Sequence, residues 1–196
     1  MSARLKTIKV KPGSPEALLT KKLYEEAFPP IERIDYSLLG DCIKNGKAEL
    51  FAYRDGEEYV GFAFVMFPAD YAYLLFCATR KDLRSRGYGS QVLKKLRRRY
   101  PTRAMVLDIE PLSDEADNST ERYRRYMFYK NNGFSDTGYE MRDFTGVYRI
   151  LSDREGFDLA GFIESYAILP EIFEGTEIYR DGKESPVFVP GQVISC

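Results

Sequence analysis

The feature that most constrains the fold is an abrupt passage from a buried strand to a helix within residues 74–100, LLFCATRKDLRSRGYGSQVLKKLRRRY. The apolar run that ends before Arg80 has the length and composition of a buried strand. A cluster of cations and the glycines Gly87 and Gly89 follow, and apolar residues then recur at helical spacing over 90–99. The chain must therefore build a strand–turn–helix unit whose turn combines glycine with positive charge.

The segments around this unit alternate between strand and helix patterns. Ser14 followed by Pro15 is a typical helix start, and β-rich runs on both sides of Asp55-Gly56 indicate a hairpin. The predicted order of elements is β-α-α-β-β-β-α-β-α-β-β-α, with the segment from Pro170 onward left unplaced. This order predicts a mixed α/β fold in which helices pack on one sheet.

Composition places the chain among soluble proteins. Hydrophobic residues make up 44% and charged residues 30% of the 196 residues, and the net charge is −1. The three cysteines lie far apart without a C-x-x-C pair, and the N-terminal residues form no apolar leader, so we expect a cytoplasmic protein without a metal site. No apolar run is long enough to span a membrane, and we expect no membrane association.

The absence of histidine excludes whole classes of enzyme mechanism. Nucleophilic triads of the Ser-His-Asp type and Cys-His pairs need an imidazole base. Histidine is also the side chain that most often transfers protons near neutral pH. Any proton chemistry here must therefore use carboxylates, tyrosine, lysine, cysteine or water.

The glycine-rich turn is chemically suited to bind phosphate. The first N–H groups of a helix are unpaired and carry partial positive charge, and glycines let a ligand approach the backbone. Arg84 and Arg86 add charged donors. The alternative is a simple glycine turn with solvated arginines. The turn is neither a P-loop nor a dinucleotide fingerprint, because the G-K-[ST] ending is absent and Val92 replaces the third glycine.

The glycine-rich turn and a second motif further along make the chain resemble a known family. RSRGYG at 84–89 matches the R/Q-x-x-G-x-G/A signature of the GNAT family of N-acetyltransferases, and FYKNNGF at 128–134 is similar to the family's [LF]-Y-x-x-x-G-F helix end. LDIEP at 107–111 occupies the place of the family's fifth strand. The resemblance covers residues 1–151, the expected catalytic domain, and leaves 152–196 as a C-terminal helix and tail packed on it. It implies a mostly antiparallel sheet of about seven strands, splayed between the fourth and fifth strands, with flanking helices.

The resemblance also implies a co-substrate, acetyl-CoA, and no metal. The signature loop would bind the pyrophosphate through its backbone, which implicates Arg84, Ser85, Arg86, Gly87, Tyr88, Gly89 and Ser90. The pantetheine arm would lie along the fourth strand, at Phe76, Cys77, Ala78 and Thr79. Lys81 or a residue of the basic helix that follows would meet the 3′-phosphate.

Catalytic candidates follow from the same resemblance. Tyr129 occupies the position of the family's general acid, where a phenol can protonate the departing thiolate; the alternative is an ordinary packed tyrosine. Asp108 and Glu110 share one face of a strand and are candidates for the base. Some relatives carry a catalytic glutamate where Asp108 stands, and its shorter side chain favours a water relay. The alternative for these carboxylates is an exposed strand end.

The acceptor side is less sharply defined. Glu32 and Asp35 follow the first helix, where the family lines its acceptor site, and their charge would attract a cationic amine; a solvated charged loop is the alternative. Cys77 lies where the thioester is expected, so a covalent acetyl-cysteine route competes with direct transfer. We give direct transfer the greater weight.

The resulting prediction is an acetyl-CoA-dependent N-acyltransferase that moves acetyl to a primary amine by direct attack in a ternary complex. Its partners would be a small amine or peptide acceptor, with a homodimer possible. The alternative is a non-catalytic acyl-CoA-binding or protein-interaction module on the same fold. Nucleic-acid binding through KKLRRRYPTR at 94–103 is disfavoured, because the net charge is −1 and cations near a helix C-terminus are ordinary.

Overall fold

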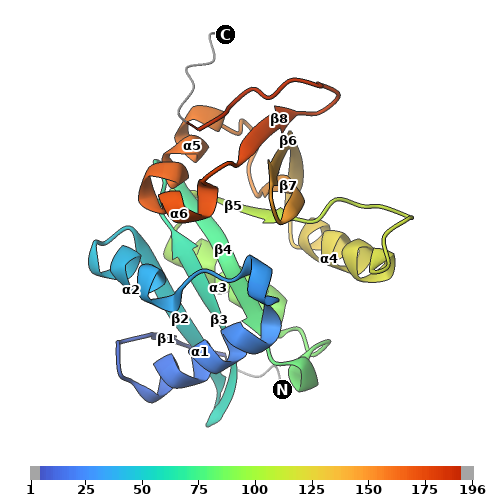
Figure 1. Ribbon diagram of the computed structural model, residues 1–196. Coiled ribbons are helices and arrows are strands. Elements are labelled where there is room, and N and C mark those ends of the chain that lie inside the picture. The colour runs from blue at the N-terminus through green and yellow to red at the C-terminus, as the bar shows by residue number, and fades with distance from the viewer. Residues whose placement is uncertain (1–4, 191–196) are drawn as a thin grey trace. The chain divides into compact units, whose positions relative to one another are not determined.

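The computed structural model describes residues 5–190 and divides into two compact units, Met1–Arg103 and Ala104–Cys196 (Figure 1). The first unit contains β1 (Lys6–Lys9), α1 (Pro15–Ala27), a 3-10 turn (Pro30–Glu32), α2 (Tyr36–Lys44), β2 (Ala48–Asp55), β3 (Glu58–Met66), β4 (Tyr71–Thr79), a second 3-10 turn (Lys81–Leu83) and α3 (Tyr88–Arg99). The second unit contains β5 (Ala104–Ile109), α4 (Ser119–Asn131), β6 (Ser135–Asp143), β7 (Gly146–Ser152), α5 (Leu159–Ile168), α6 (Pro170–Phe173) and β8 (Glu177–Arg180).

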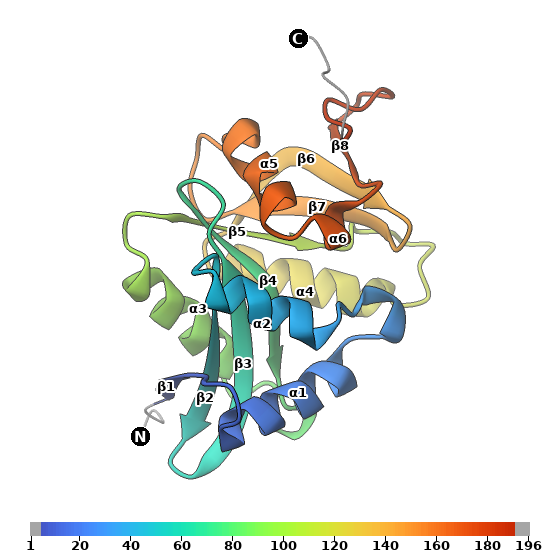
Figure 2. The same cartoon turned by 60° about the vertical axis from the view of Figure 1, so that its left-hand side comes forward.

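The first unit is an antiparallel sheet in the order β1-β2-β3-β4, with helices on both faces (Figures 1 and 2). On one face, the ring of Tyr24 in α1 meets Phe62 and Phe76 edge-on, with centroids 6.3 Å and 5.0 Å apart. On the other face, the guanidinium of Arg99 in α3 lies 4.7 Å from the centroid of the Phe51 ring. Coverage of both faces explains why β2, β3 and β4 read as continuous apolar runs rather than alternating ones.

Local signals in the sequence fix several element boundaries. Ser14 caps α1 by accepting a hydrogen bond from the N–H of Ala17 at 3.2 Å, and Pro15 occupies the first helical position. The predicted hairpin between β2 and β3 turns at residues 56–57, with Gly56 at φ +56. These confirm the helix start and the hairpin that the sequence predicts.

A close approach between β3 and β4 requires glycine at position 61. A Cβ on Gly61 would lie 2.2 Å from the carbonyl oxygen of Ala78, which is far inside van der Waals contact. The N–H of Arg80 donates to the Val60 carbonyl at 2.9 Å just beyond the paired residues. Gly61 therefore sets the path of the end of β4, from which the glycine-rich loop departs.

The second unit is an antiparallel sheet in the order β5-β7-β6-β8. Its core contains Ile150 of β7, Phe162 of α5 and Ile178 of β8, each 0% exposed. Figure 2 shows α5 and α6 on one side of the strands and α4 on the other. The mixed α/β class and the predominance of antiparallel strands are confirmed.

Two details differ from the sequence predictions. The helix expected at 90–99 begins at Tyr88, because Gly87 takes a left-handed conformation, φ +79, and ends the loop earlier than expected. The described residues contain eight strands rather than about seven. The additional strand, β8, lies in the segment that the sequence patterns leave unplaced; it pairs with β6, and Ile178 bridges to Phe188.

Other predictions of organisation stay predictions. The expected splay lies between β4 and β5, which belong to different units. The domain boundary expected at 151/152 falls inside β7, before its last residue, Ser152. Residues 191–196, the end of the expected tail, lie outside the described residues. No helix within residues 5–190 is long and apolar enough to cross a membrane.

Candidate functional site

The glycine-rich loop before α3 is held in an unusual backbone conformation. Ser85 has φ +64 and Gly87 has φ +79, so two positions of the loop are left-handed. The phenol of Tyr88 donates to the Asp55 carboxylate at 2.7 Å, which ties the start of α3 to the hairpin between β2 and β3. Tyr88 is only 7% exposed. Its side chain therefore positions the loop while its backbone stays part of the loop.

The backbone donors of this loop are unused. The N–H groups of residues 85–90 donate no hydrogen bond to any residue of the described chain, and the first bond is that of Gln91 to the Gly87 carbonyl at 3.2 Å. Glycine at the cap position offers no side-chain acceptor, and the space around Gly87 is open, since a Cβ added there would have no heavy atom within 4 Å. A row of unpaired donors at a helix start, open to the outside, is the geometry of an anion site.

The cations around the loop have different roles. Arg80 is neutralised, because its guanidinium bonds both carboxylate oxygens of Asp82 at 3.1 Å and 2.6 Å and lies 3.5 Å from Glu58. Arg84 and Arg86 are exposed and form no ion pair with a described residue. Lys81 is exposed as well and forms no ion pair with a described residue, so within this cluster only Arg80 is neutralised and the other three cations are available to an anion.

The predicted pantetheine strand is β4, which ends the sheet order within the first unit. Phe76 and Ala78 face the α1 side of this sheet, as the pairing with Phe64 and Phe62 requires. Cys77 points to the opposite face, and burial raises the pKa of its thiol to about 12. A thiol with this pKa is almost wholly protonated near neutral pH, so it is a weak nucleophile.

Tyr129 lies in the last turns of α4, as the helix-end motif predicts. Its ring packs edge-on against Phe128 and Phe134, with centroids 5.1 Å and 5.6 Å away. The N–H of Phe134 donates to the Tyr129 carbonyl at 3.1 Å, where the helix ends around Gly133. The motif residues thus hold the Tyr129 ring in a defined, half-buried place.

Asp108 and Glu110 occupy different environments although they share a strand face. Asp108 is half-buried in β5, opposite Ile150 of β7. Glu110 lies just beyond β5 and is fully engaged by α4: Arg122 and Arg125 each reach one of its oxygens at 2.8 Å, and the Asn118 amide donates at 3.2 Å. Glu110 therefore joins α4 to the end of β5.

The two acidic candidates after α1 differ from one another. Asp35 is the N-cap of α2 and accepts hydrogen bonds from the hydroxyl and the N–H of Ser37 at 2.7 Å and 2.8 Å, and these bonds lower the pKa of its carboxyl. Glu32 is exposed at the end of the 3-10 turn. Asp35 therefore has a local structural role as the cap of α2.

The structure brings the predicted residues together in two separate groups. The loop, β4, Glu32 and Asp35 belong to the first unit, and Asp108, Glu110 and Tyr129 belong to the second. Within residues 5–190, no cluster of three or more Cys, His, Asp or Glu side chains is arranged to hold a metal ion.

The model of the acetyltransferase (GNAT) family matches residues 18–126, more than half of the chain. The chain belongs to the acetyltransferase (GNAT) family. The match begins in α1, includes the whole glycine-rich loop and ends within α4, so it contains the unpaired donors of residues 85–90. No curated protein matches the chain significantly.

Solved structures share this GNAT fold at low sequence identity. A protein assigned to the GNAT family from Bacteroides thetaiotaomicron is 21% identical over 86% of this chain and 96% of its own, with a TM-score of 0.65. A Bacillus subtilis acetyltransferase in complex with CoA is 11% identical over 76% and 97%, with a TM-score of 0.57. Spermidine N-acetyltransferase from Vibrio cholerae, in complex with CoA and spermine, is 10% identical over 76% and 94%, with a TM-score of 0.55.

Sequence reasoning missed the ion pairs of Glu110. The signal was present, because Arg122 and Arg125 are spaced one turn apart on a helix and so share a face. The sequence places these arginines on α4 but does not reveal which carboxylate they meet. That contact depends on how α4 packs on β5.

Proposed function

We propose that this GNAT protein transfers acetyl from acetyl-CoA to a primary amine by direct attack in a ternary complex. The observation that carries the proposal is the row of unpaired N–H groups at residues 85–90, flanked by the guanidinium groups of Arg84 and Arg86, which pair with no described residue. A pyrophosphate offers acceptor oxygens and negative charge, which this loop lacks within the described chain.

We propose contacts for the co-substrate along its length. When bound, acetyl-CoA supplies an acetyl thioester. The proposed contacts are the loop for the pyrophosphate, Phe76, Cys77, Ala78 and Thr79 for the pantetheine arm, and Lys81 or a basic residue of α3 for the 3′-phosphate. Arg99 is the poorest candidate in α3 for the last role, because it bonds Glu49 through two nitrogens at 3.2 Å and 3.3 Å.

Proton transfer would be shared between two residues of the second unit. We assign Tyr129 as the acid that protonates the leaving thiolate, in keeping with its place in the helix-end motif. We assign Asp108 as the group that accepts the ammonium proton, directly or through water. Glu110 is the other candidate for this role; its two ion pairs favour a positioning role instead, since they occupy both carboxylate oxygens.

Direct transfer is favoured over an acetyl-cysteine intermediate. The pKa of the Cys77 thiol is raised to about 12 by burial, so only a trace of thiolate exists near neutral pH. An amine that has lost its proton to Asp108 is the stronger nucleophile. Replacement of Cys77 by serine is therefore expected to leave turnover largely intact.

The acceptor class is an amine. The structural neighbour that acts on spermidine supports this class by its name, although at 10% identity it shares only the fold. Glu32 and Asp35 remain proposed attractors of a cationic acceptor, with Asp35 also capping α2.

Thermal unfolding with and without acetyl-CoA tests the proposal. A ligand at about 100 times its Kd stabilises the native state by about 2.7 kcal/mol, which is a shift of a few degrees for a chain of this size. Gly87→Glu places a carboxylate in the loop and should abolish the shift. Gly13→Glu is the matched control, because Gly13 also has positive φ, +74, and open space before a helix.

The outcomes separate the alternatives. A shift in the wild type and in Gly13→Glu but not in Gly87→Glu supports the loop as the pyrophosphate site. Absence of any shift at millimolar acetyl-CoA contradicts the proposal. A shift without release of CoA thiol across a library of primary amines would favour the non-catalytic acyl-CoA-binding module instead.

A further inference from the structure

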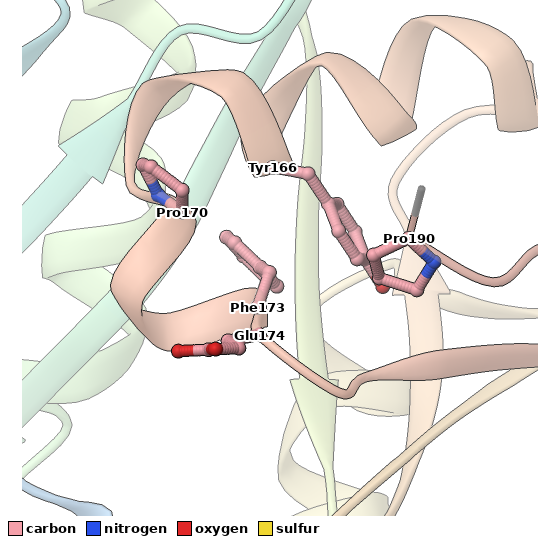
Figure 3. A pocket seen from close by; sticks show the side chains of 5 residues that line it. All are labelled: Tyr166, Pro170, Phe173, Glu174 and Pro190. Carbon is pink, nitrogen blue, oxygen red and sulfur yellow. The ribbon is translucent and has the colours of Figure 1, made fainter. Parts of the chain in front are cut away.

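The second unit contains a pocket that the catalytic assignment does not use. It has a volume of about 350 Å³ and is lined by Tyr166, Pro170, Phe173, Glu174 and Pro190 (Figure 3). These residues come from α5, α6 and the segment beyond β8, and most of the wall is apolar. The pocket lies outside residues 18–126, so it belongs to a part of the chain that the family model does not include.

The aromatic wall of the pocket is tightly packed. The rings of Tyr166 and Phe173 stack with centroids 4.3 Å apart and an interplanar angle of 22°. Phe188 packs edge-on against Tyr166 with a centroid distance of 4.8 Å. Figure 3 shows the Tyr166 ring running from α5 toward Pro190, with Phe173 beside it. The stacking covers one face of each ring, so the wall offers the pocket mainly an apolar surface.

One polar atom in this wall has no partner within the described chain. The hydroxyl oxygen of Tyr166 is buried and makes no hydrogen bond with residues 5–190, and the residue as a whole is 8% exposed. A buried hydroxyl without a partner is unfavourable, so a ligand that supplies a hydrogen-bond donor gains from meeting it. The pocket is therefore incomplete in a way that a donor group would satisfy.

Two carboxylates of the second unit act electrostatically on the Tyr166 hydroxyl. Burial is the largest cause that raises the pKa of Tyr166, and the charges of Asp143 and Asp108 raise it further, which places both carboxylates within electrostatic reach. Glu174 adds a third carboxylate at the pocket's wall. Two arginines on strands of this unit are themselves paired with carboxylates, Arg142 with Glu140 and Arg149 with Asp136 and Asp181.

We propose that this pocket binds a small protonated amine that carries one aromatic ring or a short aliphatic chain. Glu174 attracts the ammonium, and the apolar group packs on Phe173 and the two prolines. The Tyr166 hydroxyl is buried behind the wall, so the ammonium donates to it only when the Tyr166 side chain turns toward the pocket. The volume lies near the lower end of the range for small-molecule sites, about 300–1,000 Å³. That size selects a compact amine over a large polycationic antibiotic.

The position of Asp108 connects the pocket to the reaction. Asp108 is the proposed proton acceptor, and it is within electrostatic reach of the same hydroxyl that would bind the ammonium. Only the identification of the bound amine as the acetyl acceptor rests on the proposed function. The existence of an amine site in the second unit does not.

A ligand series on the full chain tests the proposal, with and without CoA. The probes are 2-phenylethylamine, the neutral 2-phenylethanol and the anionic 3-phenylpropanoate, each titrated by calorimetry. We expect the ammonium to bind at least tenfold more tightly than the alcohol and the carboxylate to bind most weakly. Equal affinity for all three probes would overturn the proposal and leave only an apolar cavity.

Two substitutions locate the binding. Glu174→Gln should weaken the amine about tenfold and leave the alcohol unchanged, while Glu184→Gln, the same change at an exposed residue outside the pocket, should change neither. Tyr166→Phe should weaken the amine several-fold without lowering the unfolding temperature, because it removes a hydroxyl that has no partner in the described chain. If Glu174→Gln leaves amine binding unchanged, the site is wrong.

Failure of this proposal is distinguishable from failure of the proposed function. Acetyl-CoA stabilisation depends on the loop of the first unit and is measured without any amine. Amine binding that is lost in Glu174→Gln, in a protein that acetyl-CoA does not stabilise, would support the pocket and refute the acetyltransferase. The reverse result would support the acetyltransferase and place its acceptor elsewhere.

Discussion

The starts of α3 and α4 carry similar charge but are arranged for different purposes. Arg84 and Arg86 precede α3, and Arg122, Arg124 and Arg125 lie in the first turns of α4. At α4, Arg122 and Arg125 meet Glu110 at 2.8 Å. At α3, neither arginine pairs with a described residue, and the N–H groups of residues 85–90 are unused as well.

A basic helix start can bind an anion from outside the chain only where the chain leaves the N–H groups and cations unpaired. At α4 the protein supplies its own anion, so the charge stabilises packing. At α3 the cap is glycine, and the neighbouring acid Asp82 is taken by Arg80. The donors at the start of α3 are therefore available to an anion from outside the chain, as the proposed function requires.

The largest effect is expected at Tyr129, near the end of α4, which we propose as the catalytic acid. Tyr129→Phe should lower kcat by about 100- to 1,000-fold, because it removes the proposed acid, and should leave the affinity for acetyl-CoA unchanged. Steady-state rates and a separate acetyl-CoA titration measure the two quantities. Tyr123→Phe, on the exposed side of the same helix at 57% exposure, is the control and should behave like the wild type. An unchanged kcat in Tyr129→Phe would contradict the assignment.

Removing the arginine pair at α3 and the pair at α4 in separate variants tests whether the first binds a ligand and the second stabilises the fold. The double variant Arg84→Ala/Arg86→Ala should weaken acetyl-CoA binding by about 100-fold with little change in unfolding, since two charge-assisted bonds to the ligand are lost. Arg122→Ala/Arg125→Ala should instead lower stability by about 1–2 kcal/mol and leave the affinity nearly unchanged. Calorimetric titration and urea unfolding of both variants decide; the opposite pattern would refute the comparison.

Glu110→Gln tests whether this carboxylate positions α4 or acts as a base. A positioning role predicts a loss of about 1–2 kcal/mol in stability, because two guanidinium groups lose their counter-ion, and a decrease in kcat of only a few fold. A base would be essential, and kcat would fall by about 100-fold or more. Urea unfolding and steady-state kinetics of the same preparation separate the two, and the pH profile of kcat should keep its shape if the positioning role is right.

The smallest effect concerns the other end of α3. Burial alone would raise the pKa of Glu49, but hydrogen bonds from Arg99, Lys9 and Tyr100 lower it to about 2. Since this pKa lies below the unfolded value, about 4.3, the stabilisation is present above that value and is lost as the pH falls toward 2. We expect about 1 kcal/mol, reduced by solvent screening.

Glu49→Gln should therefore flatten the acid limb of stability against pH, measured by unfolding at pH 6, 4 and 3. Glu57→Gln is the matched control, because Glu57 is exposed and its side chain makes no ion pair with a described residue. An equal loss in both variants would show that the anchor of α3 at Glu49 contributes nothing specific.

The sequence predicts what depends on local chemistry. The cap at Ser14, the hairpin at Gly56 and the anion-binding geometry before α3 each follow from neighbouring residues, and the motifs at 84–89 and 128–134 indicate the family correctly. What the sequence hides depends on packing between distant segments. The contact of Glu110 with Arg122 spans twelve residues, and β8 is a four-residue strand whose pairing with β6 no local pattern announces.

The pocket at Tyr166 is hidden for the same reason. Its lining residues come from α5, α6 and the segment near Pro190, and no motif unites them.

A weak signal for β8 is present, because EIYR lies between Gly175-Thr176 and Asp181-Gly182, two turn-like pairs. Cys77 is the opposite case: its sequence position allows a reactive thiol, and burial raises the pKa of that thiol to about 12, which disfavours the thiolate.

We propose that the backbone at the start of α3 binds the pyrophosphate of acetyl-CoA. Titration of ¹⁵N-labelled protein with acetyl-CoA measures this directly, because the amides of residues 85–90 would change from unpaired donors to donors bound to phosphate. We predict large, saturable shifts of these amides and small shifts at residues 119–121 of α4. Binding of acetyl-CoA that leaves the amides of residues 85–90 unmoved would contradict the claim.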